Sequence, residues 1–161
     1  MLDKEFNKNH IGKWFQDNGD GTVRINYDLT EDSVIMDLGG YHGDWTNIMI
    51  NKYNCTSHVF EPVESLVNII AGRFKGDKRV SCYDVAVGDE KKEVKIYHMA
   101  DESSVYSGGK GEAFEIMKMM EVSDVLDKIG LDFVDLVKIN IEGGEFDLLD
   151  AIIDKGLQTK F

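Results

Sequence analysis

This chain has little proline, little cysteine and few basic residues for its number of acidic ones. It contains one proline and two cysteines in 161 residues, and 18 lysines and arginines against 30 aspartates and glutamates. The formal net charge of -12 argues against a nucleic-acid backbone or an anionic membrane as the main partner, because contacts with phosphates need clustered basic side chains. We therefore expect a substrate that is neutral, cationic or small.

The two cysteines, Cys55 and Cys82, form no Cys-x-x-Cys pair and have no histidine near them at metal-ligand spacing. We expect both to be reduced, buried thiols. The turn at residues 17–21 resembles a calcium loop, but Gln16 and Tyr27 stand where carboxylates are required. The sequence therefore predicts no metal site, and the turn is expected to lead into a strand over residues 22–27.

No apolar run approaches the roughly 20 residues of a membrane-spanning helix. The N-terminus also lacks the basic and apolar segments of a signal peptide. A cytoplasmic location is the default expectation. The length suits one domain with its own core.

Hydrophobic periodicity predicts alternating strands and helices, which is typical of an α/β fold with a parallel sheet. The parallel strands are expected at residues 33–38, 57–60, 80–87 and within 133–145. Two further strands, 93–98 and 113–122, are expected to be antiparallel. A short helix should follow them, with Ser123 as N-cap and Gly130 at its end.

Each of the three longer predicted helices carries an apolar stripe that should face the sheet. The stripe of the helix opened by Asp44 comprises Trp45, Ile48, Met49, Lys52 and Tyr53. The stripe of the helix after Pro62 comprises Val63, Leu66, Val67, Ile70 and Phe74. The stripe of the last helix comprises Phe146, Leu149, Ile152 and Ile153.

The apolar run at residues 34–38 ends in a turn containing Gly39, Gly40 and Gly43. Such a segment is typical of a buried parallel strand that leads into a cofactor-binding loop, because glycine lets the backbone approach a ligand closely. Glu61 closes the next strand, where a carboxylate can accept hydrogen bonds from both hydroxyls of a ribose. The pattern predicts a cofactor that contains a nucleoside.

The spacing of these glycines differs from the dinucleotide fingerprint Gly-x-Gly-x-x-Gly. Counted from Gly39, the sixth position is Asp44, whose charge would repel a pyrophosphate at a helix N-terminus. S-adenosylmethionine carries a sulfonium cation and no phosphate, so an acidic loop suits it. Gly39-x-Tyr41-x-Gly43 fits the looser turn of methyltransferases with its middle glycine replaced. S-adenosylmethionine is thus favoured over NAD.

Four blocks, in the right order, resemble the FkbM family of S-adenosylmethionine-dependent methyltransferases. The blocks are residues 34–43, Phe60-Glu61-Pro62, Ala86-Val87-Gly88, and residues 138–145, which resemble the signature Lys-Ile-Asp-x-Glu-Gly-x-Glu. Ser103 and Ser104 resemble the family's paired serines. The resemblance covers residues 22–157, leaving 1–21 as an N-terminal extension of a single domain. It implies a Rossmann-like class I methyltransferase fold, with a mostly parallel sheet flanked by helices.

The resemblance also implies methylation of a hydroxyl on a small-molecule or glycan acceptor. The residues expected to bind the cofactor are Asp37, Gly39, Gly40, Tyr41, Gly43, Glu61, Pro62, Asp84, Val85 and Asn140. Asp37 would receive the cofactor's ammonium directly or through water, or would only fix its own turn. Glu61 would hold the ribose, or act as a helix N-terminal acid. Asp84 and Val85 would meet the adenine, although an ordinary loop acid is the alternative for Asp84.

Three residues are catalytic candidates. Removing the proton of an alcohol needs a base, for which Glu142 is the candidate, with Lys138 as its charge partner. Against this, Glu142 could instead cap the following helix, and Lys138 could be paired for structural reasons only. His42 lies beside the glycine turn and could reach an acceptor, or could be an exposed loop histidine.

Two features depart from the family pattern. Asn140 replaces the signature aspartate, which removes a charge. The sequence ends at Phe161, where another strand is expected, so the last strands of the sheet would be lacking and one parallel edge left uncovered. These features leave three hypotheses: an O-methyltransferase, a truncated or degenerate domain that acts as a cofactor-binding or interaction module and could self-associate through that edge, and an NAD-dependent oxidoreductase.

Overall fold

The computed structural model describes residues 12–98, 103–104 and 114–161. Its first sheet has four parallel strands in the order β3-β2-β1-β8. These strands are β1 (Val34–Leu38), β2 (Thr56–Phe60), β3 (Val80–Tyr83) and β8 (Leu136–Ile139). The central strand β1 has a neighbour on each side, so the loop that follows β1 lies between the ends of β2 and β8.

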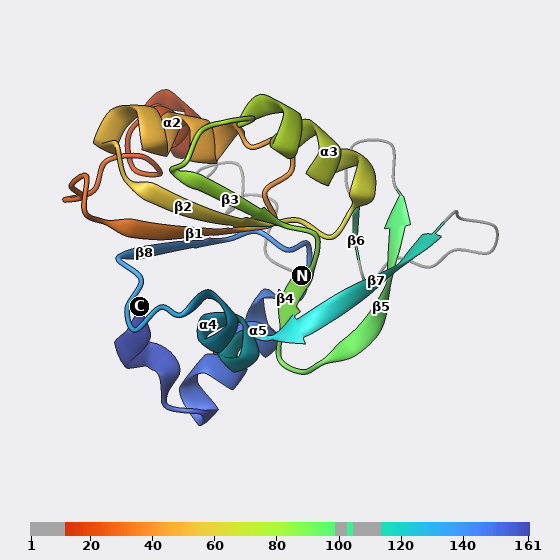
Figure 1. The fold of residues 1–161 in the computed structure, drawn as a ribbon. Coiled ribbons are helices and arrows are strands. Elements are labelled where there is room, and N and C mark those ends of the chain that lie inside the picture. Colours follow the sequence, from red (N-terminus) through yellow and green to blue (C-terminus); the bar gives the residue numbers. More distant parts are fainter. Residues whose placement is uncertain (1–11, 99–102, 105–113) are drawn as a thin grey trace.

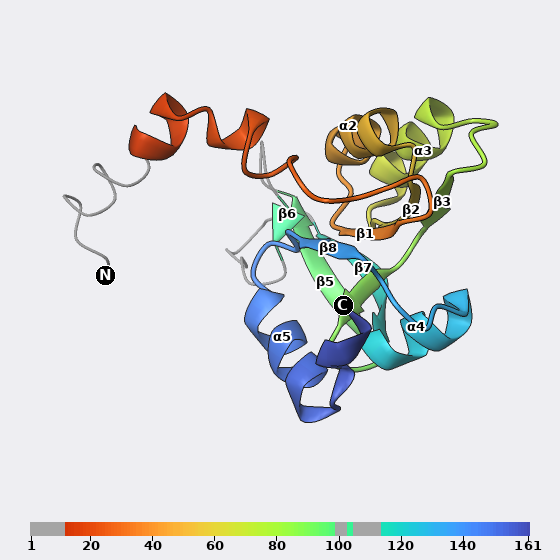
Figure 2. The same ribbon diagram turned by 90° about the vertical axis from the view of Figure 1, so that its left-hand side faces the viewer.

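Helices cover both faces of this sheet (Figures 1 and 2). α2 (Asp44–Tyr53) and α3 (Glu64–Arg73) lie on one face, and α4 (Val122–Ile129) and α5 (Glu145–Asp154) lie on the other. The architecture confirms the predicted α/β, Rossmann-like class I methyltransferase fold, with a parallel sheet flanked by helices.

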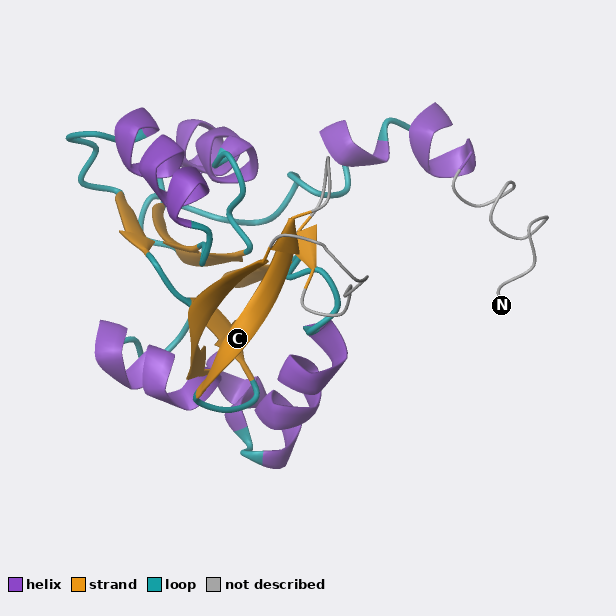
Figure 3. Cartoon of the chain, turned by 90° about the vertical axis from the view of Figure 1, so that its right-hand side faces the viewer, coloured by secondary structure: helices purple, strands orange, loops and turns teal. Residues whose placement is uncertain are grey.

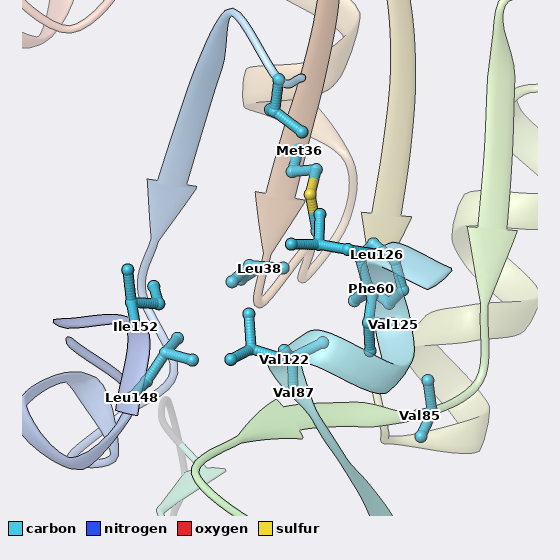
Figure 4. Packing of buried hydrophobic residues seen from close by; sticks show 11 residues of the cluster. Met36, Leu38, Phe60, Val85, Val87, Val122, Val125, Leu126, Leu148 and Ile152 are labelled. Atoms are coloured by element: carbon cyan, nitrogen blue, oxygen red, sulfur yellow. The ribbon is translucent and has the colours of Figure 1, made fainter. Parts of the chain in front are cut away.

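The alternation of side chains along β1 produces two separate cores. Ile35 packs in the cluster that includes Met49 of α2 and Ile70 of α3. Met36 and Leu38 point the other way and pack with residues of α4 and α5, as Figure 4 shows. Every apolar residue of β1 from Ile35 onward is buried, which explains why this strand reads as a continuous apolar run.

A second sheet has the order β4-β7-β5-β6. It comprises β4 (Ala86–Gly88), β5 (Lys92–His98), β6 (Ser103–Ser104) and β7 (Phe114–Glu121). Figure 3 shows the molecule with this second sheet toward the viewer. β5 and β7 are antiparallel, as predicted, whereas β4 runs parallel to β7. The chain also contains two short 3-10 helices, η1 (Gly19–Gly21) and η2 (Leu157–Lys160), and residues 12–16 are helical.

The strand predicted at residues 22–27 is wrong. Residues 22–25 form turns, and residues 26–30 have no regular structure. The backbone of this segment is bonded by side chains of α2: Trp45 Nε1 donates to the Arg24 carbonyl at 3.0 Å. Tyr53 Oη donates to the Ile25 carbonyl at 2.8 Å. Because the helix supplies these donors, the segment follows α2 instead of pairing with a strand.

Two other boundaries differ from the prediction. Residues 80–87 do not form one strand, because the chain leaves the first sheet after Tyr83 and β4 joins the second sheet. The N-cap of α4 is Glu121 rather than Ser123, because the Glu121 carboxylate accepts the Ser123 N–H at 3.2 Å. The predicted stop at Gly130 is confirmed, since Gly130 is the left-handed C-cap.

The buried faces of two helices differ from the predicted stripes. In α2 Ile50 is buried, whereas Ile48 is 43% exposed. In α5 Leu148 and Ile152 are buried, whereas Phe146, Leu149 and Ile153 are exposed. Both helices carry apolar residues on more than one face, so periodicity alone cannot choose which face packs against the sheet.

The two cysteines are free thiols, and only Cys55 is fully buried; Cys82 is half-buried. The expectation of two buried thiols is therefore correct for Cys55 only. Within the described residues no helix combines the length and the apolar character needed to cross a membrane.

Substitution of adjacent leucines tests the orientation of α5. Leu148 has no exposed surface, whereas Leu149 is 42% exposed. We expect Leu148→Ala to lower the free energy of unfolding by about 2–5 kcal/mol through loss of buried surface and cavity formation. Leu149→Ala, the matched control, should change it by less than about 1 kcal/mol. Urea denaturation measures both values, and a larger loss for Leu149→Ala would contradict this orientation.

Candidate functional site

The parallel strands of the first sheet end together, at Leu38, Phe60, Tyr83 and Ile139. In open α/β sheets, ligands bind at the carboxyl ends of the strands, where neighbouring loops diverge. The central loop there comprises residues 39–43, and we call it the cofactor loop after the role that the sequence predicts for it. It follows β1 and leads directly into α2.

Strand ends hold the cofactor loop closely. The N–H groups of Gly39 and Gly40 both donate to the Phe60 carbonyl, at 2.9 and 3.2 Å. Gly39 has φ +79°, and a Cβ at this position would lie 1.9 Å from the carbonyl oxygen of Asn140. Only glycine therefore fits between the end of β1 and the segment after β8.

Glu61 lies beneath the cofactor loop with only 4% of its surface exposed. One carboxylate oxygen accepts the Tyr41 N–H at 2.9 Å, and the other accepts the Val63 N–H at 3.0 Å. The first bond supports Tyr41 in a left-handed conformation, with φ 51°. Burial raises the pKa of Glu61, and the two backbone hydrogen bonds oppose this shift. Each oxygen still has capacity for one further donor.

Asp37 is completely buried, and its two oxygens have different partners. Lys138 Nζ donates to one oxygen at 2.8 Å, and Thr46 Oγ1 donates to the other at 2.7 Å. Asp37 and Lys138 are register partners in neighbouring strands. Lys138 Nζ also donates to the Gly39 carbonyl at 2.7 Å. Lys138 thus pairs with Asp37, a partner that the sequence analysis did not predict.

Tyr41 and His42 form an aromatic pair on the cofactor loop. Their ring centroids are 3.9 Å apart with an interplanar angle of 26°, and Tyr41 is 52% exposed. The His42 carbonyl accepts a hydrogen bond from Arg73 at 2.8 Å, and Arg73 also pairs with Asp44 at 2.5 Å. His42 is half-buried rather than fully exposed, and its backbone is held by α3.

Asn140 and Glu142 lie in the segment after β8, at the carboxyl ends of the parallel strands. Both are exposed, and Asn140 Nδ2 donates to Glu142 at 3.1 Å. Glu142 has a left-handed backbone, with φ 56°. The N-cap of α5 is Gly144 rather than Glu142. Glu145, the first residue of α5, accepts the N–H groups of Ile141 and Gly143 at 2.9 and 2.8 Å and so fixes the turn before the helix.

The residues predicted to meet the adenine have separate surroundings. Asp84 directly follows β3 and is exposed. Val85 is 7% exposed and packs in the core shared with α4 and α5, as Figure 4 shows. In this conformation its side chain belongs to the core rather than to a ligand surface. Pro62 is half-buried beside Glu61.

The structure brings Asp37, Gly39, Glu61 and Lys138 together around one loop. Sequence reasoning missed Thr46, Arg73 and Glu145, whose side chains hold the Asp37 carboxylate, the His42 carbonyl and the Ile141 N–H. For Thr46 a signal was available: a polar residue two positions into a helix that starts at the end of a buried strand. The partner of Arg73 is distant in sequence, so no local pattern could indicate it.

The matches to known proteins include a family model and a solved structure. A family model described as the methyltransferase FkbM domain matches residues 37–160. No curated protein matches the chain. Among solved structures, the chain is similar to the crystal structure of the MccD protein, with 17% identity and a TM-score of 0.31. That similarity covers 45% of this chain and 29% of the MccD chain.

A methyl group on Gly39 tests the fit of the cofactor loop. We expect Gly39→Ala to lower the free energy of unfolding by roughly 2–5 kcal/mol, since strain at positive φ adds to the clash with Asn140. Gly76→Ala is the control: Gly76 has φ +85°, but a Cβ there meets nothing within 4 Å. Gly76→Ala should lower the free energy of unfolding by only about 1–2 kcal/mol. Urea denaturation measures both values. Equal losses of unfolding free energy would show that the close approach of Asn140 to Gly39 adds no cost to a side chain there.

Proposed function

The chain belongs to the FkbM methyltransferase family, and we propose on this premise that it is an S-adenosylmethionine-dependent O-methyltransferase. The acceptor in this proposal is a hydroxyl group of a small molecule or of a sugar-like compound. The family match spans the cofactor loop, Glu61 and the segment from Lys138 to Glu145. These residues lie at the carboxyl ends of the parallel strands, at the site described above.

The observation that carries this proposal is the place of Glu61. A buried carboxylate stands at the tip of the strand next to the glycine turn, and two N–H groups leave part of its acceptor capacity unused. A ribose diol offers two hydroxyl donors, which match that remaining capacity. Asp44 stands at the N-terminus of α2, and its charge, although paired with Arg73 at 2.5 Å, suits a cationic cofactor better than a pyrophosphate.

S-adenosylmethionine would supply an electrophilic methyl group on a sulfonium. The chain's own groups would bind and orient: Glu61 the ribose, and Gly40 and Tyr41 the methionyl part. Alignment of the acceptor hydroxyl accounts for much of the acceleration in such a displacement. Glu142, exposed three residues after the end of β8 and hydrogen-bonded to Asn140, is our candidate for removing the hydroxyl proton. His42 is the second candidate.

Two observations favour a second function, a cofactor-binding or interaction module without turnover. Asn140 stands where the family signature has aspartate, and its amide can neither serve as a base nor hold an ammonium by charge. β8 is also an edge strand of the first sheet, and unpaired edges favour self-association. A stable dimer in sedimentation without methyl transfer would favour this alternative.

Substitution of Glu61 tests the proposal directly. We expect the wild-type protein to bind S-adenosylhomocysteine and not NAD in calorimetry. Glu61→Gln should weaken binding of S-adenosylhomocysteine roughly ten- to hundredfold, because hydrogen bonds to a charged acceptor contribute about 1.5–3 kcal/mol. Glu64→Gln, at an exposed position in the first turn of α3, should bind like the wild type. Preference of the wild type for NAD would refute the proposal.

The raised pKa of Glu61 predicts two pH effects of opposite sign. Ribose hydroxyls donate to the ionised carboxylate, so binding of S-adenosylhomocysteine should weaken as the pH falls through the raised pKa of Glu61. Because burial raises the pKa of Glu61, the ligand-free fold favours the protonated carboxyl more than the unfolded chain does. Its stability should therefore fall as the pH rises from the ordinary pKa of glutamate to the raised value. Titrations of binding and of melting temperature measure both, and Glu61→Gln should lack both effects.

A further inference from the structure

The cofactor loop is held from both sides by side chains of the strands that flank β1. From the end of β2, Glu61 accepts the Tyr41 N–H at 2.9 Å. From β8, Lys138 donates to the Gly39 carbonyl at 2.7 Å. An anion thus holds an N–H of the loop, and a cation holds a carbonyl two residues before it. Together these bonds set the orientation of the peptide groups that would face a ligand.

Lys138 does more than neutralise Asp37. A cation that only compensated this buried charge would need one contact, at 2.8 Å to the carboxylate. The ammonium has three N–H groups, and a second one is used on the Gly39 carbonyl. The side chain of Lys138 is 15% exposed, so it lies just below the surface of the loop rather than deep in the core.

The hydrogen bonds of the Gly39–Gly40 peptide explain why this contact matters. Its carbonyl accepts from Lys138, and its N–H donates to the Phe60 carbonyl at 3.2 Å. With both polar groups bonded, the peptide plane cannot turn without breaking a bond, although two glycines would otherwise allow many conformations. Thr46 completes the arrangement by holding the other oxygen of Asp37 at 2.7 Å.

We propose that Lys138 is a positioning residue that preorganises the cofactor loop through the Gly39 carbonyl, and so sets the affinity for S-adenosylmethionine. The use of this loop as the cofactor site rests on the proposed function. Lys138 acts through the backbone and does not touch the reacting atoms. Asn140 lies two residues after Lys138. The strand that holds the cofactor loop therefore also leads into the segment that we expect on the acceptor side.

The test separates the contact with Gly39 from the compensation of charge. Lys138→Met alone leaves the buried Asp37 carboxylate without its cation, so it should be strongly destabilised. Asp37→Asn and the double variant Asp37→Asn/Lys138→Met form the informative pair, because neither contains that buried charge. They differ in the donor to the Gly39 carbonyl. We expect the double variant to bind S-adenosylhomocysteine at least tenfold more weakly than Asp37→Asn, at a similar melting temperature.

Hydrogen exchange of the ligand-free protein supplies a second readout. The amides of Gly40 and Tyr41 should exchange at least tenfold faster in the double variant than in Asp37→Asn, whereas amides within β2 should not change. Lys138→Arg, which keeps charge and donors, should restore slow exchange of these two amides. Its melting temperature should exceed that of Lys138→Met.

The outcomes are distinct. Equal affinity and equal loop exchange in Asp37→Asn and in the double variant would overturn the proposal and leave Lys138 as a structural counterion. If the wild type fails to bind S-adenosylhomocysteine, the proposed function fails, and the exchange of the Gly40 and Tyr41 amides still decides whether Lys138 positions the loop. If the double variant does not fold, Asp37→Asn alone decides it, because Lys138 keeps its donor to the Gly39 carbonyl there. Gly40 and Tyr41 amides that exchange at least tenfold faster in a stably folded Asp37→Asn than in the wild type would overturn the proposal.

Discussion

A carboxylate with no exposed surface is costly unless a cation and hydrogen bonds compensate its charge. Asp37 meets this requirement with Lys138 from the neighbouring strand and Thr46 from the following helix. The three side chains join β1, β8 and α2 at the point where the cofactor loop begins. Because the same ammonium holds the Gly39 carbonyl, the compensation of a buried charge and the shape of the loop depend on one interaction.

Asp37 and Glu61, the two acids at the carboxyl ends of the central strands, have different roles because their surroundings differ. Asp37 is neutralised by a cation and has both oxygens engaged by side chains. Among the described residues, the hydrogen-bond partners of Glu61 are two backbone N–H groups, and burial raises its pKa. A carboxylate that is buried without an ion pair gains from any additional donor that reaches it. This difference makes Glu61, rather than Asp37, the group best suited to recognise the hydroxyls of a ligand.

The sequence predicted the class of the fold well, and the reason lies in local patterns. The apolar run ending at Leu38, the glycines after it and the acid at Glu61 each mark the end of a buried strand, and the structure confirms these strands. The helix stop at Gly130 also depended only on local backbone preference. Residues 22–27 were misassigned because their backbone partners, Trp45 and Tyr53, lie in a helix that local propensity cannot take into account.

What the sequence determined by itself was the order of elements, the position of the cofactor loop and the presence of acids beside it, since these follow from periodicity and from the conformational freedom of glycine. Tertiary structure alone decided which acid pairs with Lys138, which face of α5 is buried, and that Val85 packs in the core. Each of these outcomes depends on neighbours distant in sequence: Asp37 and Lys138 meet only because β1 and β8 are adjacent and in register. The physical reason is that burial and charge compensation are properties of the assembled sheet, whereas strand and turn preferences belong to the local chain.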